Sequence, residues 1–228
     1  SAVTNLNPLS GFILKKDSPS CGMERVKIYP DAGGPARRAA SGIFARILME
    51  AHPALPVEEE GRLNDPLLRE NFINRVFVHR RWQDLLERGL TPASLIDFHT
   101  RHKYLVMTHS VAAYQRLGSL LSNLSGNRID HVAPYYFEQL MLALKRRTTR
   151  KRHYNTMQHI MGYLKKRIDA GDKEEILDAM QRYKHEEVPL VVPITLFKHY
   201  FRKHPDRYIQ NQAYLSPHPD GLRLRNHI

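Results

Sequence analysis

The only cysteine of this 228-residue chain, Cys21, lies in the segment "KKDSPSCGMERVKIY" among serine, proline and glycine. A structural cysteine usually sits among apolar neighbours, where it acts as a small hydrophobic side chain. The polar loop around Cys21 predicts instead a sulfur that is presented to other groups, as in a reactive or metal-binding thiol. The alternative is a surface cysteine that has no role.

Three histidines in "FHTRHKYLVMTHS" have a spacing that places them on one side of a helix. At about 100° per residue, His99, His102 and His109 fall within roughly an 80° sector. Imidazoles three residues apart can share a metal ion or a phosphate, and Lys103 at the edge of the sector favours an anion. No carboxylate or cysteine lies on that sector, so the alternative is hydrogen-bonded histidines at a helix packing seam.

A second polar stripe lies in "KRHYNTMQHIMGYLKK". Aromatic and basic side chains together can stack on a nucleotide and neutralise it. A glycine inside a helix costs about 1 kcal/mol relative to alanine, so Gly162 predicts either the close approach of another helix or room for a flat ligand. The candidate substrate-binding or anion-binding residues of this stripe are Asn155, His159, Tyr163 and Lys165.

Positive charge is concentrated between Lys145 and Arg167, where nine Lys and Arg residues occur without any Asp or Glu. The whole chain carries 35 Lys and Arg against 23 Asp and Glu, a formal net charge of +12. Such a surface attracts phosphate or another polyanion, and the alternative is a solvated helix face. The residues predicted to contact nucleic acid are Arg146, Arg147, Arg150, Lys151 and Arg152.

Residues 1–55 are predicted to form a truncated α/β remnant with one or two short strands and a helix. "GFILKK" and "RVKIY" are typical of strands, and "GGPARRAASGIFARILMEAH" predicts a helix with Pro35 at its first position. So few elements do not bury both faces of a sheet. The segment therefore has the pattern of the end of a domain whose beginning is absent.

Three prolines and three consecutive glutamates in residues 52–66 predict a domain boundary or a linker, and the pattern beyond it is helical. Asp65 before Pro66 and Thr91 before Pro92 are helix start signals. The fold class is therefore mainly α, with a multi-helix domain of about seven or eight helices over residues 56–228. Helices are expected over 66–88, 92–109, 111–123, 131–147, 150–168, 173–186 and 193–203.

One cysteine permits no intrachain disulfide, which is typical of a reducing, cytoplasmic compartment. No run approaches 18 apolar residues and no signal peptide is recognisable, so no membrane association is expected. The chain has no P-loop, GxGxxG or GxSxG motif. The oligomeric state stays open.

Two segments of the chain resemble known families. "GFILKKDSPSCGMERVKIY" and "GIFARILMEAHPALPVEEEGRL" resemble the closing part of the TudS-like thiouracil desulfurases. Residues 65–228 resemble the YbgA family through "FHTRHKYLVMTHS", "NTMQHIMGYLKK", "VPLVVPITLFKHY" and "YLSPHPDGLRLRN". The second resemblance covers essentially all of the helical part.

The desulfurase resemblance implies a four-iron, four-sulfur cluster held by three cysteines, with Cys21 as its last ligand and Ser18 as a catalytic residue near the substrate. The cluster is expected in the intact protein and not in this chain as given, because the other two cysteines belong to the family's N-terminal half. The YbgA resemblance brings no activity with it. Fusion to a base-desulfurising domain implies a nucleobase, nucleotide or RNA partner.

Three functions are therefore compatible with the sequence. The intact protein is an iron–sulfur desulfidase of thiolated pyrimidine bases, to which this chain contributes a part that is inactive alone. The alternative is a non-catalytic helical module that binds a nucleotide or nucleic acid, or that mediates an interaction. The third is an independent enzyme on the histidine-bearing helix, which ranks last because no general base or nucleophile is identifiable.

Overall fold

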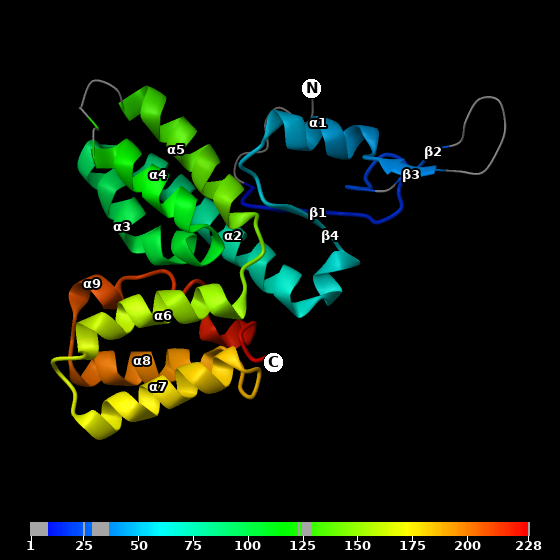
Figure 1. Ribbon diagram of the computed structural model, residues 1–228. Coiled ribbons are helices and arrows are strands. Elements are labelled where there is room, and N and C mark those ends of the chain that lie inside the picture. Colours follow the sequence, from blue (N-terminus) through cyan, green and yellow to red (C-terminus); the bar gives the residue numbers. More distant parts are fainter. Residues whose placement is uncertain (1–8, 25, 29–36, 123, 125–128, 228) are drawn as a thin grey trace. The chain divides into compact units, whose positions relative to one another are not determined.

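The computed structural model in Figure 1 describes residues 9–24, 26–28, 37–122, 124 and 129–227. The chain forms two compact units, Ser1–Gln83 and Asp84–Ile228, whose boundary falls within helix α2 (Pro66–Glu87). Helices hold most of the described residues, and the described strands are short and belong to the first unit. The predicted fold class is confirmed. The domain boundary predicted at residues 55 and 56 stays a prediction.

The described strands of the first unit form two separate pairs. Strand β1 (Phe12–Leu14) lies parallel to β4 (Val57–Glu59), and β2 (Val26–Ile28) lies antiparallel to β3 (Arg37–Ala40). The strands predicted in "GFILKK" and "RVKIY" are β1 and β2. Helix α1 (Ile43–Ala51) packs on the core of this unit. That core is a buried apolar cluster of Leu14, Met23, Ala45, Leu48 and Val57.

Two boundary predictions in the first unit are wrong. The helix predicted from Pro35 begins only at Ile43, because residues 37–40 pair with β2 and strand pairing overrides their helix propensity. The predicted linker 52–66 contains β4, because Val57 is buried in the core and its strand pairs with β1. The linker interpretation therefore mistook part of the folded unit for a connection.

The second unit is helical in all the regular structure described for it. The predicted helices are confirmed to within a few residues at each end. Thr91 and Ser94 form a reciprocal cap at the start of α3, and Asp65 similarly accepts from the first turn of α2 in the other unit. The helices are α3 (Pro92–His109), α4 (Val111–Ser122), α5 (Ile129–Leu144), α6 (Arg150–Leu164), α7 (Ala170–Lys184), α8 (Val191–Lys203) and α9 (Arg207–Gln210).

Helix α3 is the central element of the second unit. It contacts α4, α5 and α6, and the chain then continues through α7 and α8, which lie side by side with α6 in Figure 1. Because α3 is packed on several sides, most of its polar side chains in the second half are buried as well as its apolar ones. None of the helices described is long and apolar enough to cross a bilayer.

Candidate functional site

The loop that carries Cys21 rests directly on the N-terminus of α1. The carbonyl of Ser20 accepts from the N–H of Ala45 at 3.2 Å, and the carbonyl of Gly22 accepts from the N–H of Gly42 at 2.8 Å. These carbonyls satisfy two of the amide groups that a helix start leaves without partners. The approach is so close that a Cβ on Gly42 would lie 2.3 Å from the carbonyl carbon of Ser20. The backbone on both sides of Cys21 is therefore fixed.

The Cys21 sulfur is half-buried and has both polar and apolar neighbours. Its Sγ lies 3.4 Å from the Ser20 hydroxyl, which in turn lies 3.2 Å from the Ser18 hydroxyl. The Ser18 oxygen also accepts from the Cys21 N–H at 3.2 Å. The side chain packs partly against the core cluster of the first unit. The predicted residues Ser18 and Cys21 thus come together in one hydrogen-bonded turn, with the sulfur at the border of the core.

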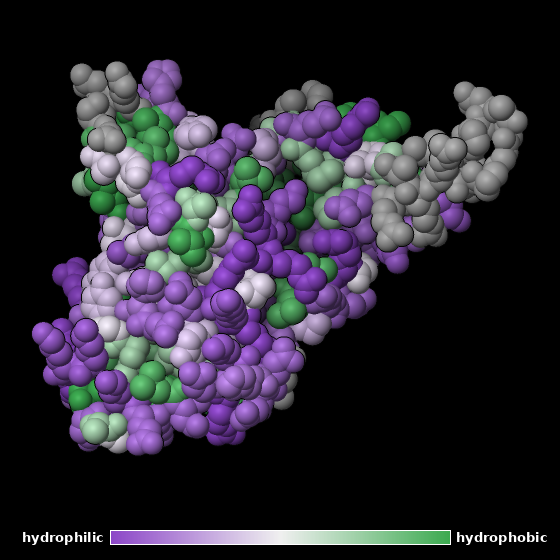
Figure 2. Space-filling model, in the orientation of Figure 1, coloured by the Kyte–Doolittle hydropathy of each residue, from purple (hydrophilic) through white to green (hydrophobic). Residues whose placement is uncertain are grey.

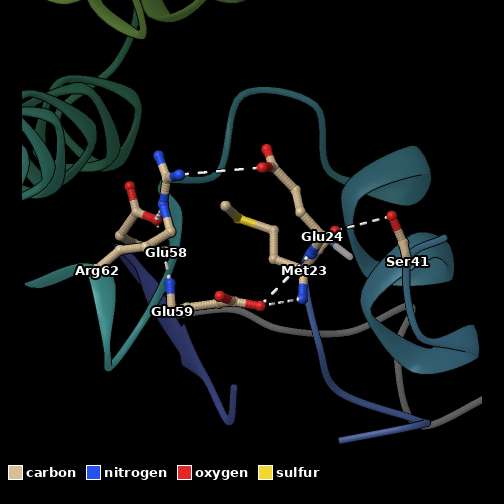
Figure 3. Close-up of polar contacts among 6 residues, drawn as sticks. All are labelled: Met23, Glu24, Ser41, Glu58, Glu59 and Arg62. Carbon is tan, nitrogen blue, oxygen red and sulfur yellow. Dashed lines mark hydrogen bonds and ion pairs between the residues drawn. The ribbon is translucent and has the colours of Figure 1, made fainter. Parts of the chain in front are cut away.

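Two buried glutamates of β4 fix the segment that follows the cysteine, as Figure 3 shows. Glu59 accepts from the N–H of Met23 at 2.8 Å, and Ser41 donates to the Met23 carbonyl at 2.8 Å. Glu58 accepts from Arg62 Nε at 2.6 Å, and Arg62 also lies 3.9 Å from the Glu24 carboxylate. The acidic run, which lies in the segment predicted to be a domain boundary or a linker, therefore holds the backbone just after Cys21.

The electrostatics of this cluster favour charged side chains. Burial by itself lowers the pKa of Arg62, but its hydrogen bond to Glu58 and the negative charges of Glu58 and Glu24 raise that pKa overall. Arginine is charged near neutral pH with or without this rise in pKa. The rise therefore reflects the favourable interaction of the guanidinium with the Glu58 carboxylate. Little in the sequence indicated this cluster of charged side chains, because a three-residue strand among glutamates shows no recognisable alternation of apolar and polar residues.

The donors of this chain do not by themselves fit an iron–sulfur cluster ligated by three cysteines. The sequence contains one cysteine, which provides one thiolate. Within the described residues, no group of three or more His, Cys, Asp or Glu side chains is placed to hold a metal ion. Since Fe–S clusters are held chiefly by several cysteine thiolates, Cys21 can be only one ligand of such a group.

The three histidines predicted on one side of α3 are all buried and hydrogen-bonded. His102 Nδ1 donates to the carbonyl of Phe98 at 2.7 Å, and His109 Nδ1 donates to the carbonyl of Arg146 at 2.6 Å. His99 Nδ1 lies 3.1 Å from the Tyr136 hydroxyl. These contacts are the hydrogen-bonded seam that the sequence left as the alternative to an anion or metal site.

Burial also sets the charge of His99. Loss of solvent, together with the positive charge of Lys103, lowers the pKa of His99 to about 4. Near pH 7 this imidazole is therefore neutral. A neutral histidine does not attract an anion by charge, so the geometry around His99 favours its packing role.

The ring of Tyr208, which the sequence did not single out, contacts two of the predicted binding residues, Lys103 and Tyr163. Lys103 Nζ lies 4.7 Å from the ring centroid of Tyr208, and the Tyr163 ring stacks on the same ring at 5.5 Å. The Tyr104 hydroxyl donates to the Tyr163 hydroxyl at 3.5 Å. Burial raises the pKa of Tyr104 and Tyr208, which keeps both phenols neutral. The arrangement is a cation on an aromatic cluster.

The rest of the α6 stripe lies at or near the surface. His159 and Lys165 are exposed, and Asn155 is half-buried. A Cβ added to Gly162 would meet no atom within 4 Å. Close approach of another helix therefore does not explain this glycine, and the space beside it is open.

The basic segment divides into two clusters at opposite ends of α6. Because α6 has 15 residues, its ends lie roughly 20 Å apart. In Figure 2 the surface over α6, α7 and α8 is mostly hydrophilic. The exposed members are Lys145, Arg146, Arg147, Lys151 and Arg152 at one end and Lys165, Lys166 and Arg167 at the other.

Several of these cations also hold the fold together. Arg150 donates to the carbonyl of Tyr183 at 2.8 Å and lies over the Tyr183 ring. Arg152 donates to the carbonyls of His109 and Arg147 at 3.2 Å. Two of the five predicted nucleic-acid contacts are therefore engaged in linking elements of the second unit.

Sequence reasoning missed two further buried histidines, His153 and His218. His153 Nδ1 lies 3.1 Å from the Tyr214 hydroxyl, and complete burial together with the charge of Arg225 lowers its pKa well below the usual range. Its position four residues before the core residue Met157 was the available signal.

Comparison with known proteins matches the two parts of the chain separately. A family model described as a protein of unknown function, DUF1722, matches residues 103–219. A family model described as 2-thiouracil desulfurase matches residues 1–60. The uncharacterized protein YbgA of Escherichia coli strain K12 is 28% identical over 153 residues, which cover 67% of this chain and 90% of that protein. No solved structure matches the chain.

Proposed function

The chain belongs to the DUF1722 family of proteins of unknown function. We propose, from the segment that precedes the matched region, that it acts in the removal of sulfur from thiolated pyrimidine bases. In this proposal Cys21 is one thiolate ligand of a four-iron, four-sulfur cluster, and Ser18 orients the substrate. The match of residues 1–60 to the 2-thiouracil desulfurase model supports the reaction class. The remaining cluster ligands come from outside this chain.

The observation that carries the proposal is a half-buried sulfur on a rigid turn. Residues on both sides of Cys21 are bonded to the start of α1, and Glu59 holds the next residue. A metal ligand benefits from this arrangement because its thiolate is positioned before the metal arrives. Hydroxyl groups near the sulfur, such as that of Ser20 at 3.4 Å, tune a bound cluster by hydrogen bonding.

The test is anaerobic reconstitution of the complete gene product with iron and sulfide, followed by iron analysis and visible absorption. We expect a brown protein, and we expect Cys21→Ser to lose bound iron. Ser20→Ala is the matched control, because it changes the neighbouring side chain and leaves the thiol in place. A colourless wild-type protein, or a Cys21→Ser variant with wild-type iron content, would refute the ligand role.

A second candidate function is nucleic-acid binding by the helical unit. The exposed cluster of Lys145, Arg146 and Lys151 favours this function, because the neighbouring sequence contains no Asp or Glu. Phosphate contacts release counterions, so affinity for RNA should fall steeply as salt is added. The alternative, a solvated surface that only aids solubility, predicts no affinity.

A charge-reversal variant tests this second function. K145E/R146E/K151E should reduce the slope of log affinity against log salt for single-stranded RNA by about 2. Arg150 and Arg152 are left unchanged because they donate to backbone carbonyls of the fold. The control variant K173E/K203E/R207E reverses the same number of exposed charges elsewhere in the unit. Equal effects of both variants would exclude a specific basic surface.

A further inference from the structure

A cavity of about 580 Å³ lies in the second unit between α8 and the chain after α9. Figure 1 shows these parts in orange and red, with the C-terminal segment returning beside the other helices of the unit. The volume is in the range of small-molecule sites, roughly 300–1,000 Å³. Most of the lining residues come from "VPLVVPITLFKHY" and "YLSPHPDGLRLRN", two segments that the proposed functions leave unused.

The cavity is held open by contacts between its two walls. The N–H of Val191, at the start of α8, donates to the carbonyl of Arg225 at 3.1 Å. Arg225 is buried and donates from Nη1 to the carbonyl of Tyr214 at 2.7 Å. Gln210 donates to the carbonyl of Phe201 at 2.9 Å, which fixes the entry of the segment after α9. The C-terminal wall is therefore bonded to α8 at both ends.

Positive charge dominates the polar part of the lining. Among the described residues around the cavity, the only acid is Asp220, so a surplus of three positive charges remains. Asp220 is bonded to Lys198 Nζ through both oxygens, at 2.8 and 3.0 Å. That hydrogen bond, with the nearby charges of His218 and Arg225, holds the pKa of Asp220 below its usual value. The lining cations are Lys198, Arg202, Arg223 and Arg225.

One of these cations is held by an unusual backbone conformation. Arg223 has a φ of 51°, in the left-handed region that favours glycine. Its N–H donates to the carbonyl of Asp220 at 3.0 Å, which closes the tight turn after Pro219. Such conformations cost of order 1–3 kcal/mol and cluster where a side chain must be aimed. The turn places Arg223 among the lining residues.

Part of the remaining lining is apolar. Ile194 and Phe201 belong to α8, and Leu215 and Leu224 belong to the opposite wall. Ile194, Phe201 and Leu215 are buried core residues of the unit, so these walls are rigid. A cavity lined by both cations and apolar side chains suits a ligand with a charged head and a flat apolar body.

We propose that this cavity binds a small organic phosphate, in which a dianionic phosphate monoester meets the cations and a flat, nucleobase-sized body lies against the apolar wall. A dianion matches the surplus of positive charge better than a carboxylate does. Arginine side chains suit phosphate because their planar groups donate two parallel hydrogen bonds. The proposal is independent of Cys21 and of desulfurisation.

Binding must compete with the ion pair already present. Lys198 is bonded to Asp220, so the phosphate takes Lys198 from the carboxylate and leaves the carboxylate near the incoming charge. Removal of the lysine should therefore weaken binding, whereas removal of the acid should strengthen it. A surface that responds only to net charge at a distance predicts the same two signs, so the control must be a lysine of the same helix that lies outside the lining.

The experiment titrates the full chain with adenosine 5′-monophosphate, phenyl phosphate, adenosine and inorganic phosphate at low salt. Binding is followed by calorimetry and by the methyl resonance of Ile194, with the buried Ile160 of α6 as the internal reference. We expect saturable binding of both phosphate esters, weaker binding of phosphate alone, and a shift confined to Ile194. Lys198→Gln should weaken the esters about tenfold or more.

The matched variants are Asp220→Asn, which should bind more tightly, and Lys203→Gln, which should leave binding unchanged. Lys203 lies on α8 close to Arg202, but it does not line the cavity. Circular dichroism confirms that each variant is folded. Absence of a saturable Ile194 shift at about 10 mM ester, where even a very weak site would fill, overturns the proposal. An equal loss of ester affinity in the Lys198→Gln and Lys203→Gln variants, or weaker ester binding by Asp220→Asn, also overturns the proposal.

Discussion

Gly42→Ala should destabilise the first unit by displacing the loop that carries Cys21. An alanine Cβ at this position would lie 2.3 Å from both the carbonyl carbon and the oxygen of Ser20, and 2.8 Å from the Cys21 nitrogen. All three are backbone atoms, so no rotation of a side chain relieves the overlap. The φ of Gly42 is −60°, which alanine adopts freely. The cost is therefore steric and does not come from backbone conformation.

The magnitude follows from two contributions. Forcing an extra methyl into a packed site typically costs about 1–3 kcal/mol. Alanine is also a poorer residue than glycine at the position before a helix, which adds roughly 0.5–1 kcal/mol. The free energy of unfolding should therefore fall by about 1.5–4 kcal/mol. With a urea slope of about 2 kcal/mol per molar, in the usual range for a small domain, the midpoint should fall by about 1–2 M.

Two residues of the first unit make the assay specific. Trp82 is the only tryptophan of the chain and is buried in α2, so its fluorescence reports unfolding of this unit. Cys21 is the only thiol, so its rate of reaction with an aromatic disulfide reports the loop. We expect a lower urea midpoint and a changed thiol rate in Gly42→Ala.

Gly162→Ala is the matched control, with the opposite sign. An added Cβ there meets no atom within 4 Å, and the residue lies inside α6. The better helix propensity of alanine should stabilise the second unit by up to about 1 kcal/mol, measured by circular dichroism. If Gly42→Ala leaves both the Trp82 midpoint and the Cys21 rate unchanged, the close packing of the loop on α1 is wrong.

Three further predictions test individual side chains. Glu59→Ala removes the buried carboxylate that accepts from Met23 and should lower the stability of the first unit by about 1–3 kcal/mol. Glu60→Ala, which removes a solvent-facing carboxylate paired with Lys15, should have a smaller effect in the same Trp82 assay. Thr91→Ala should cost about 1 kcal/mol in thermal or urea unfolding, because it removes the cap of α3. The pKa of His99 is about 4 in the folded chain against about 6.5 in the unfolded chain. The stability that depends on neutral His99 is therefore fully present above pH 6.5, and roughly 3 kcal/mol of it is lost as the pH falls towards 4. His99→Gln should flatten the dependence of the unfolding free energy on pH over this window.

The sequence predicted best those features that depend on neighbouring residues. Asp65 and Thr91 were recognisable as helix caps because a cap is decided within four residues, and both accept from the first turn as expected. β4 was not recognisable, because the partner that makes it a strand is β1, more than 40 residues earlier. The helix expected from Pro35 failed for a related reason, since residues 37–40 pair with β2.

The same distinction applies to the candidate site. The periodicity placed His99 and His109 on one side of a helix, but their partners, Tyr136 and the Arg146 carbonyl, lie 37 residues further along the chain. A single sequence does not reveal such pairs, so it left a ligand site and a packing seam as alternatives. In the basic segment, charge alone did not separate Arg150, which bonds the Tyr183 carbonyl, from Lys151, which is exposed.

Cys21 has two environments, and two substitutions separate the roles that they suggest. Its sulfur packs against the core cluster, where a cysteine can act simply as a small hydrophobic group. If packing were its whole role, Cys21→Ala should cost little and Cys21→Ser should cost more, because serine brings a hydroxyl to an apolar contact. If Cys21 is a metal ligand, both substitutions should abolish iron binding, because neither alanine nor serine provides a thiolate. Loss of iron in both variants of the complete gene product, with only the serine variant markedly destabilised, would assign both roles to one sulfur.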